Sequence, residues 1–166
     1  NRHPDALLDG PSQFDFIDGG NCEVAILAFA QIDAAGNVNV SRFAGANPGA
    51  GGFIDIAHNA RELIFTGTFT TGGFEAAIAN DSLAITREGR VRKFTDRVHE
   101  VTYPLRRNVA DRGQKATIVT ERAVFAVERD GLALIEVAPG IDVRAQVIEQ
   151  MAFAPTRIAD PLPTMR

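Results

Sequence analysis

The stretch best suited to chemistry is rich in glycine and runs from Asn47 to Ala60, with the sequence NPGAGGFIDIAHNA. The four glycines around its start are Gly45, Gly49, Gly51 and Gly52. Glycine reaches positive φ and lets another molecule approach the backbone closely. From Phe53 onward apolar residues recur at helical spacing, which predicts a helix that begins there. The first N–H groups of that helix lack backbone partners and carry the positive end of its dipole.

Unpaired N–H groups after a glycine loop predict a site for an anion, either a phosphate or the oxyanion of an acyl-transfer intermediate. The loop is not a P-loop, because no Gly-Lys-Ser/Thr follows it. Ile54 stands where the third glycine of a dinucleotide-binding motif belongs. A tight connection whose glycines only solve a backbone problem fits the pattern equally well.

Three amide side chains, Gln31, Asn37 and Asn39, flank the turn that follows an apolar run over residues 23–32. Ligands of α/β proteins bind at the sheet edge where such turns lie. One hypothesis is therefore that these amides position a ligand. The alternative is ordinary turn chemistry at Asn37, which follows Gly36, and polar strand ends at the other two.

Other residue classes exclude several functions. Cys22 is the only cysteine, so an internal disulfide is impossible, and a reducing cytoplasm is the simplest setting. The three histidines lie far apart, which argues against a structural zinc site, and we expect no metal. The net charge of −4 argues against nucleic-acid binding. No run approaches the roughly 20 apolar residues that span a membrane.

The charge is distributed unevenly. Residues 87–115 hold nine Lys or Arg against four Asp or Glu. Such a run usually marks a solvated surface. The other interpretation is a surface that meets an anionic ligand tail or an acidic partner domain.

The elements that position these residues predict a single α/β domain over residues 1–166, with a mostly parallel sheet flanked by helices. We expect strands at Gln13–Ile17, Glu23–Ile32 (buried on both faces), Asn37–Phe43 and Arg61–Phe69. With the helix at Phe53, these form a βαβ unit.

The second half reads as richer in strands and hairpins. Hairpin turns are expected at residues 80–82 and at Asp130-Gly131, and a further strand near Val98–Tyr103. Asp142 is predicted to cap a helix over residues 143–151, and residues 154–166 to form a surface tail. Glu121 and Arg122 would point to opposite faces of a strand and could not pair with each other.

Several segments taken together resemble a known family. In order they are DGGNCEVAILAFAQIDAAGNVNVSRF, GAGGFIDIAHNARELIFTGTFT, VTERAVFAV, GLALIEVAPGID and MAF. They resemble the family I coenzyme A transferases, most closely the fused acetate/propionate type, from about Asp5 to Phe153. The resemblance implies the α/β transferase fold and identifies this chain as the C-terminal part of the β-type half.

The resemblance also implies an activity. Such enzymes move CoA between short-chain carboxylic acids through a glutamyl-CoA thioester, with CoA as a substrate and no tightly bound cofactor. The oxyanion N–H falls on Gly52, and Gly51 keeps the approach open. The substrate or CoA would contact Gly49, Gly51, Phe53, Gln31, Asn37 and Asn39. Acyl-CoA and a carboxylic acid are the expected partners, in a homo-oligomer.

One departure qualifies this picture. The nucleophilic glutamate belongs to a Ser-Glu-Asn-Gly or Ala-Glu-Pro-Gly motif, and neither occurs here. We therefore expect the upstream half of the same enzyme to supply it and the chain alone to be inactive. A non-catalytic binding or regulatory module of the same fold is the alternative. A sugar-phosphate isomerase has less support, because no carboxylate–histidine pair lies near the loop in sequence.

Overall fold

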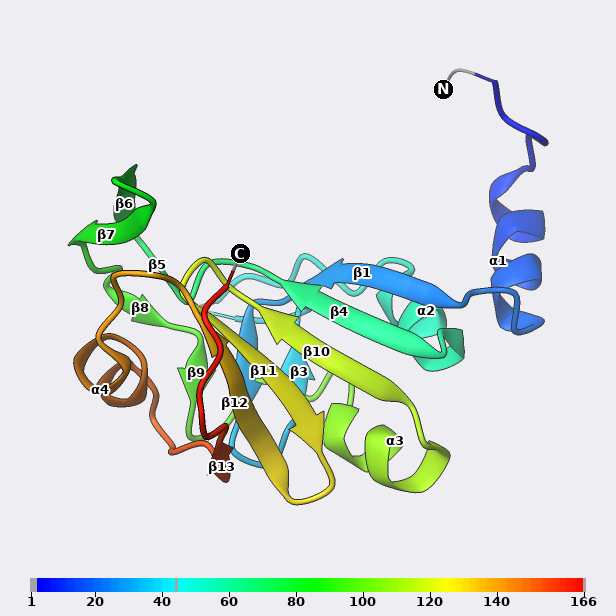
Figure 1. Ribbon diagram of the computed structural model, residues 1–166. Coiled ribbons are helices and arrows are strands. Elements are labelled where there is room, and N and C mark those ends of the chain that lie inside the picture. The colour runs from blue at the N-terminus through cyan, green and yellow to red at the C-terminus, as the bar shows by residue number, and fades with distance from the viewer. Residues whose placement is uncertain (1–2, 44, 166) are drawn as a thin grey trace.

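The computed structural model describes residues 3–43 and 45–165 and is built around one six-stranded sheet (Figure 1). In spatial order the strands are β1 (Val24–Ala28), β4 (Glu62–Thr66), β10 (Lys115–Val119), β11 (Ala123–Glu128), β12 (Gly131–Val137) and β13 (Arg157–Ile158). The pairings β1–β4, β4–β10 and β12–β13 are parallel, and the two on either side of β11 are antiparallel. The predicted α/β class with a mostly parallel sheet is confirmed.

The predicted βαβ unit is present. Helix α2 (Phe53–Asn59) leads into β4, which pairs in parallel with β1, and α2 packs against β1. Phe53 and Ala57 are the buried residues of α2, in agreement with the predicted stripe. The ring of Phe53 packs against that of Phe65 in β4, with 5.9 Å between centroids.

The first apolar run does not form one strand buried on both faces, as the sequence suggested. Its first part is β1, the outermost strand of the sheet, where Val24 is 50% exposed and Ile26 is 68% exposed. Its last part turns into β2 (Gln31–Asp33), which joins a separate sheet with β3 (Val38–Asn39) and β9 (Phe94–Thr95). Within β1, buried Ala25 alternates with the exposed Val24 and Ile26. After β1 the chain enters the core, where Ile32 is fully buried.

The segment Gln13–Ile17 is helical, so its prediction as a strand was wrong. Helix α1 (Gly10–Asp18) begins after Asp9, whose carboxylate accepts a hydrogen bond from the N–H of Ser12 at 3.0 Å. Pro11 occupies the first turn, where its missing N–H costs nothing. This cap outweighs five residues of alternating pattern.

Two short two-stranded sheets complete the strands. Strand β5 (Thr70–Thr71) pairs with β8 (Val91–Arg92), and β6 (Glu75–Ala79) forms a hairpin with β7 (Ser82–Arg87). Asn80 and Asp81 turn that hairpin with φ values of 51° and 56°, as the sequence predicted. Figure 1 shows this hairpin projecting at one end of the molecule and α1 projecting at the other.

The region near Val98–Tyr103 contributes only a bridge between Tyr103 and Val38, so the predicted strand is wrong. Pro104 then begins helix α3 (Leu105–Arg112), which packs on β10 and β11. Asp142 caps α4 (Val143–Gln146) as predicted, through the N–H of Ala145 at 2.8 Å. Helix α4 is short, and a 3₁₀ turn over Ile148–Gln150 follows it.

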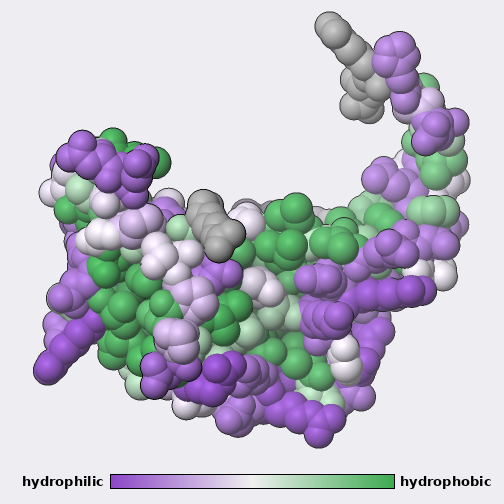
Figure 2. Space-filling view, viewed as in Figure 1, coloured by the Kyte–Doolittle hydropathy of each residue, from purple (hydrophilic) through white to green (hydrophobic). Residues whose placement is uncertain are grey.

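The last residues are more than a surface tail. They supply β13, which pairs with β12, and the N–H of Met165 donates to the carbonyl of Val137. The chain end therefore covers the β12 edge of the sheet. The opposite edge, at β1, lies between the two projections and shows apolar surface in Figure 2.

Candidate functional site

The glycine loop has the conformation that its composition predicted. Gly45, Gly49 and Gly51 adopt positive φ values of 79°, 80° and 54°. Gly52 has a φ of −81° and immediately precedes α2. The loop is held by two backbone bonds, from Gly49 to the carbonyl of Ser41 and from Phe53 to the carbonyl of Ala50. Three of the four glycines therefore adopt a backbone conformation that other residues rarely reach.

The start of α2 presents free donors. No side chain caps this helix, and within the described residues no hydrogen bond engages the N–H of Gly51 or Gly52. The N–H of Phe53 is occupied by Ala50. Of the residues predicted to face a substrate, Gly51 and Gly52 thus retain donors, whereas Phe53 contributes its buried ring.

Gly52 also has a packing reason to be glycine. A Cβ at this position would lie 2.5 Å from Cζ of Phe14 and 2.6 Å from its Cε1. No such contact limits Gly49 or Gly51, where a Cβ would meet open space. Helix α1 therefore packs its Phe14 ring onto the last residue of the loop.

The three predicted amides separate into two groups. Asn39 donates to Oε1 of Gln31 at 2.8 Å, and the backbone N–H of His99 donates to the same oxygen at 3.1 Å. Asn37 instead donates to a carboxylate oxygen of Asp33 at 3.2 Å, within the turn between β2 and β3. The geometry at Asn37 is the turn chemistry considered above.

Asn39 anchors the glycine loop from below. It is fully buried, and its amide donates to the carbonyl of Arg42 while its oxygen accepts from the N–H of Ser41 and of Arg42. Ser41 in turn accepts from Gly49. All polar atoms of Asn39 are thus engaged inside the protein, so its contribution to a ligand site is to hold the loop.

A cavity of about 440 Å³ opens beside this network. Its lining residues are Arg42, Phe43, Gly45, His99 and Glu100. Glu100 accepts a hydrogen bond from the hydroxyl of Ser41 at 3.3 Å. Gly45, the first glycine of the loop, therefore lines this cavity together with the oppositely charged Arg42 and Glu100. His99, which also lines it, donates its backbone N–H to Gln31.

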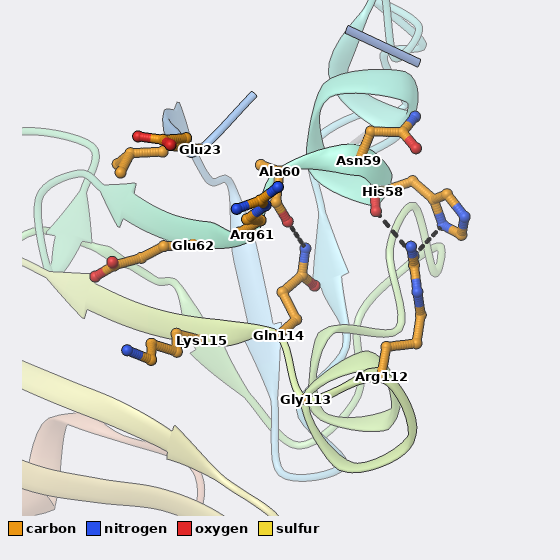
Figure 3. A pocket seen from close by; sticks show the side chains of 11 residues that line it. Glu23, His58, Asn59, Ala60, Arg61, Glu62, Arg112, Gly113, Gln114 and Lys115 are labelled. Carbon is orange, nitrogen blue, oxygen red and sulfur yellow. Dashed lines mark hydrogen bonds between the residues drawn. The ribbon is translucent and has the colours of Figure 1, made fainter. Parts of the chain in front are cut away.

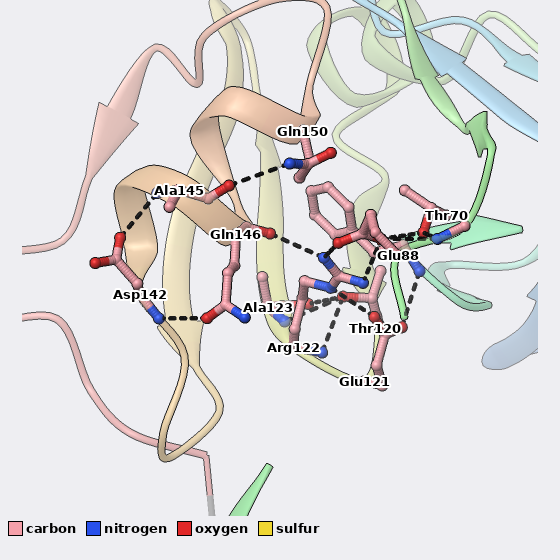
Figure 4. A network of polar contacts seen from close by, with 12 residues as sticks. Thr70, Glu88, Thr120, Glu121, Arg122, Ala123, Asp142, Ala145, Gln146 and Gln150 are labelled. Carbon is pink, nitrogen blue, oxygen red and sulfur yellow. Dashed lines mark hydrogen bonds and ion pairs between the residues drawn. The ribbon is translucent and has the colours of Figure 1, made fainter. Parts of the chain in front are cut away.

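A second polar cluster, which the sequence did not reveal, lies beyond the carboxyl end of β10 (Figure 4). Arg122 is fully buried and makes two hydrogen bonds to Glu88, at 2.7 and 3.0 Å. Its Nε donates to Oε1 of Glu121 at 2.6 Å. The expectation that Glu121 and Arg122 could not pair was wrong, because both lie in the connection between β10 and β11, where strand alternation does not apply.

The cluster lowers the pKa of Glu88. Burial alone would raise the pKa of its carboxyl group, but hydrogen bonds from Arg122 and Thr70 outweigh burial and hold the pKa below its ordinary value. Glu121 uses its other oxygen to accept from the backbone N–H of Phe69 at 2.8 Å. Both carboxylates are therefore hydrogen-bonded partners of one buried guanidinium.

Lys93 also reaches the carboxyl ends of the parallel strands. Its Nζ lies 3.9 Å from the ring centroid of Phe29, which follows β1, and next to Gly67, which follows β4. Burial lowers the pKa of Lys93 to about 8, although the charge of Glu121 acts in the opposite direction. The sequence shows Lys93 only as one of nine basic residues, so no local signal marks it.

The other basic residues of segment 87–115 lie on different elements. Arg87 pairs with Glu75 on the projecting hairpin, and Arg106 donates to the carbonyls of Ala35 and Arg129. Arg112 contacts His58. This distribution fits the interpretation of a solvated surface better than that of one binding face.

A cavity of about 560 Å³ lies at the opposite end of the parallel strands, next to the amino ends of β1, β4 and β10 (Figure 3). Arg112 donates to Nδ1 and to the carbonyl oxygen of His58, both at 2.8 Å. Gln114 donates to the carbonyls of Ala57 and Ala60, both at 2.7 Å, and so ties the end of α2 to β10. These bonds fix α2, and with it the loop, from the far side.

The described residues contain no group of three or more His, Cys, Asp or Glu side chains placed to hold a metal ion. Across residues 3–43 and 45–165, no helix is long and apolar enough to cross a membrane.

Comparison with known proteins finds long matches over most of the chain. It is 44% identical over 155 residues to the acetate CoA-transferase YdiF of Escherichia coli O157:H7, which covers 93% of this chain and 29% of that protein. It is 39% identical over 161 residues to the caffeate CoA-transferase of Acetobacterium woodii, covering 94% and 30%. No family model matches the chain.

The same relation appears in three dimensions. The crystal structure of YdiF from Escherichia coli O157:H7, described as a thioester complex with CoA, superposes with a TM-score of 0.93 at 43% identity. The match covers 98% of this chain and 31% of that one. The chain thus spans about 30% of the length of the relatives it matches.

Proposed function

We propose, on the premise that this chain is homologous to one segment of the CoA-transferases, that it forms part of an enzyme moving CoA between short-chain carboxylic acids. The resemblance to family I coenzyme A transferases seen in the sequence is confirmed by these relatives. The acids exchanged, and the position of this chain in the C-terminal part of a longer protein, belong to the proposal.

The observation that carries the proposal is the pair of unengaged donors at Gly51 and Gly52. Transfer of an acyl group passes through a tetrahedral oxyanion, and preorganised backbone N–H groups stabilise such a charge. The N–H of Gly52 is the proposed oxyanion donor. A Cβ at Gly49 or Gly51 would meet nothing within 4 Å, so the loop is open at these two positions.

In this mechanism the other predicted residues act through the loop. Phe53 packs its ring beneath the start of α2, and the bonded pair of Gln31 and Asn39 fixes the loop's first half. Asn37 lies in the neighbouring turn. We propose direct substrate contact for Gly51 and Gly52, and support of the loop for Phe53 and Asn39.

The nucleophilic carboxylate is proposed to come from a segment outside these 166 residues. The chain lacks the glutamate motifs of the resembling enzymes. Glu75 pairs with Arg87, and Glu88 and Glu121 pair with Arg122. Glu100, which lines the cavity beside the loop, accepts a hydrogen bond from Ser41. Covalent catalysis requires an available carboxylate, and we propose that none of these four glutamates supplies it.

The same absence favours one alternative, a binding or regulatory module that kept the fold and the donors without a nucleophile. The measurement that separates the two is acyl exchange between acetyl-CoA and labelled propionate. We expect no exchange by the chain alone and exchange when the remaining segment of a full-length relative is joined to it. Failure of the joined protein to exchange would favour the module.

A matched pair of variants tests the role of Gly52. Gly52→Ala keeps the N–H and Gly52→Pro removes it, while both add a Cβ that meets Phe14. The φ of −81° at Gly52 is close to the value that proline requires. We expect Gly52→Pro to lose about a hundredfold more exchange activity than Gly52→Ala in the joined protein. Equal losses would contradict the oxyanion role.

A further inference from the structure

Lys93 is a largely buried residue that the proposed mechanism does not use. It lies between β8 and β9 with 8% of its surface exposed. Within the described residues, no hydrogen bond or ion pair joins its Nζ to another group. Buried ammonium groups are normally paired, because desolvation of an unpaired charge is costly. The Lys93 amine therefore has unused donor capacity at a defined place.

The Lys93 amine lies at the carboxyl ends of the parallel strands β1 and β4. Nζ lies over the ring of Phe29, directly after β1, and beside Gly67, directly after β4. Open α/β sheets bind ligands outside this edge. The ring face attracts the positive charge but accepts no ordinary N–H hydrogen bond, so it holds the ammonium without satisfying it.

The neighbouring carboxylate is already engaged. Glu121 lies close enough to raise the pKa of Lys93, yet its oxygens accept from Arg122 and from the N–H of Phe69. Glu88, the other acid of the cluster, is held by Arg122 and Thr70. The charged groups around Lys93 thus satisfy one another and leave its donors free.

Gly67 supplies the space that the amine occupies. A Cβ at this position would lie 2.6 Å from Nζ of Lys93. Gly67 does not adopt a positive φ, so its backbone conformation does not require glycine. A side chain at Gly67 would therefore crowd the Lys93 amine and, at 3.3 Å from Cε1, the ring of Phe29.

We propose that the Lys93 ammonium binds a carboxylate at the carboxyl ends of β1 and β4. The inference rests on the proposed function only in its choice of anion, since the proposed reaction exchanges carboxylic acids. Two sources share this chemistry: the free short-chain acid, and a carboxylate side chain from the segment that completes the enzyme. Binding supplies the counter-charge that the buried amine lacks.

The two lysines of the chain make a direct test possible, because Lys115 is exposed and serves as the internal reference. The chain is labelled with ¹³C at lysine Cε, and a Lys115→Arg variant assigns the two signals. The pKa of Lys93 is then measured in the chain alone, with added propionate, and in the joined protein without propionate. Sodium chloride at matched ionic strength is the control.

A carboxylate that binds the protonated amine tenfold more tightly raises its pKa by about one at saturation. A rise with propionate in the chain alone assigns the free acid, and a rise in the joined protein without propionate assigns a protein carboxylate. An unchanged pKa in all samples overturns the proposal. Gly67→Ala, which places a methyl group against Nζ, is expected to abolish the rise.

Exchange activity measured on the same joined protein keeps the two proposals separate. Exchange without any change in the pKa of Lys93 overturns this inference and leaves the transferase proposal intact. A pKa rise with propionate in the absence of exchange supports the carboxylate site and contradicts the transferase.

Discussion

The ring of Phe14 in α1 lies against Gly52 in the glycine loop, so closely that a Cβ on Gly52 would come 2.5 Å from Cζ of the ring. The residue proposed to donate to an oxyanion is therefore also a packing position. A substitution that keeps the N–H, such as Gly52→Ala, still disturbs this packing unless the ring is removed as well.

The contact predicts coupled effects on stability. Gly52→Ala should lower the free energy of unfolding by about 1–3 kcal/mol, since it overpacks the contact with Phe14. The loss should shrink in a Phe14→Ala background, which a double-mutant cycle measured by urea unfolding will detect. Gly10→Ala, where a Cβ meets nothing within 4 Å, is the matched control. Additive losses would show that the contact with Phe14 is not the cause of the destabilisation.

Removing the buried guanidinium should be costly. Arg122→Met leaves Glu88 and Glu121 without their cation, and breaking such a buried pair costs about 3–5 kcal/mol. Arg87→Met, which breaks the exposed pair with Glu75, should cost less than about 1 kcal/mol. Chemical denaturation of both variants tests the contrast, and similar losses would contradict it.

The same cluster predicts an acid sensitivity. The pKa of Glu88 is lowered in the folded chain, so the unfolded chain binds the proton first as pH falls. Stability from Glu88 is therefore present above the unfolded pKa and lost as pH falls through the folded pKa. Comparing unfolding of the wild type and Glu88→Gln across acidic pH should show a shallower slope in the variant. Parallel slopes would remove Glu88 from the acid response.

Lys93 predicts a rise in stability with pH in the alkaline range as well. The unfolded chain keeps this proton up to the ordinary pKa of 10.5, whereas the folded chain releases it near 8. Between these values the unfolded chain binds more protons, so the free energy of unfolding rises with pH, by about 2 kcal/mol from pH 8 to pH 10. Lys93→Met should lack this rise and Lys115→Met should keep it. Tyr103 titrates equally in all three.

Gln114 should be essential for the placement of α2. Its side chain donates to the carbonyls of Ala57 and Ala60 and accepts from the hydroxyl of Tyr103 at 2.8 Å. Gln114→Leu leaves these buried groups without partners, with a loss of about 3 kcal/mol. Amide hydrogen exchange should then increase in α2 before it increases in β11. Uniform changes would show that the bonds do not act on α2 specifically.

Local patterns predicted the elements whose signals lie close together in sequence. The stripe at Phe53 and Ala57, the hairpin turn at Asn80 and Asp81, and the cap at Asp142 all formed as expected. Helix α1 was missed because five alternating residues are a weak signal beside the cap formed by Asp9.

The candidate site was less predictable, because its contacts join distant parts of the chain. Glycine content located the loop, but the ring of Phe14 above Gly52 follows from the packing of α1. Arg122 contacts Glu88, 34 residues away in sequence. Lys93, between β8 and β9, contacts Phe29 after β1 and lies next to Gly67 after β4. Periodicity indicates which face of an element is apolar, but it does not indicate which residues distant in sequence come into contact.

The two edges of the six-stranded sheet differ in whether their backbone groups are already paired. At β12 the chain's own end, with β13 and the residues up to Met165, occupies the backbone groups that another strand would need. At β1, within the described residues, the outward backbone groups and Ile26 have no covering strand. A further strand would therefore find the longer run of uncovered backbone at β1, which has five residues against two in β13. In a preparation of these residues alone, self-association with rising concentration should begin at the same edge.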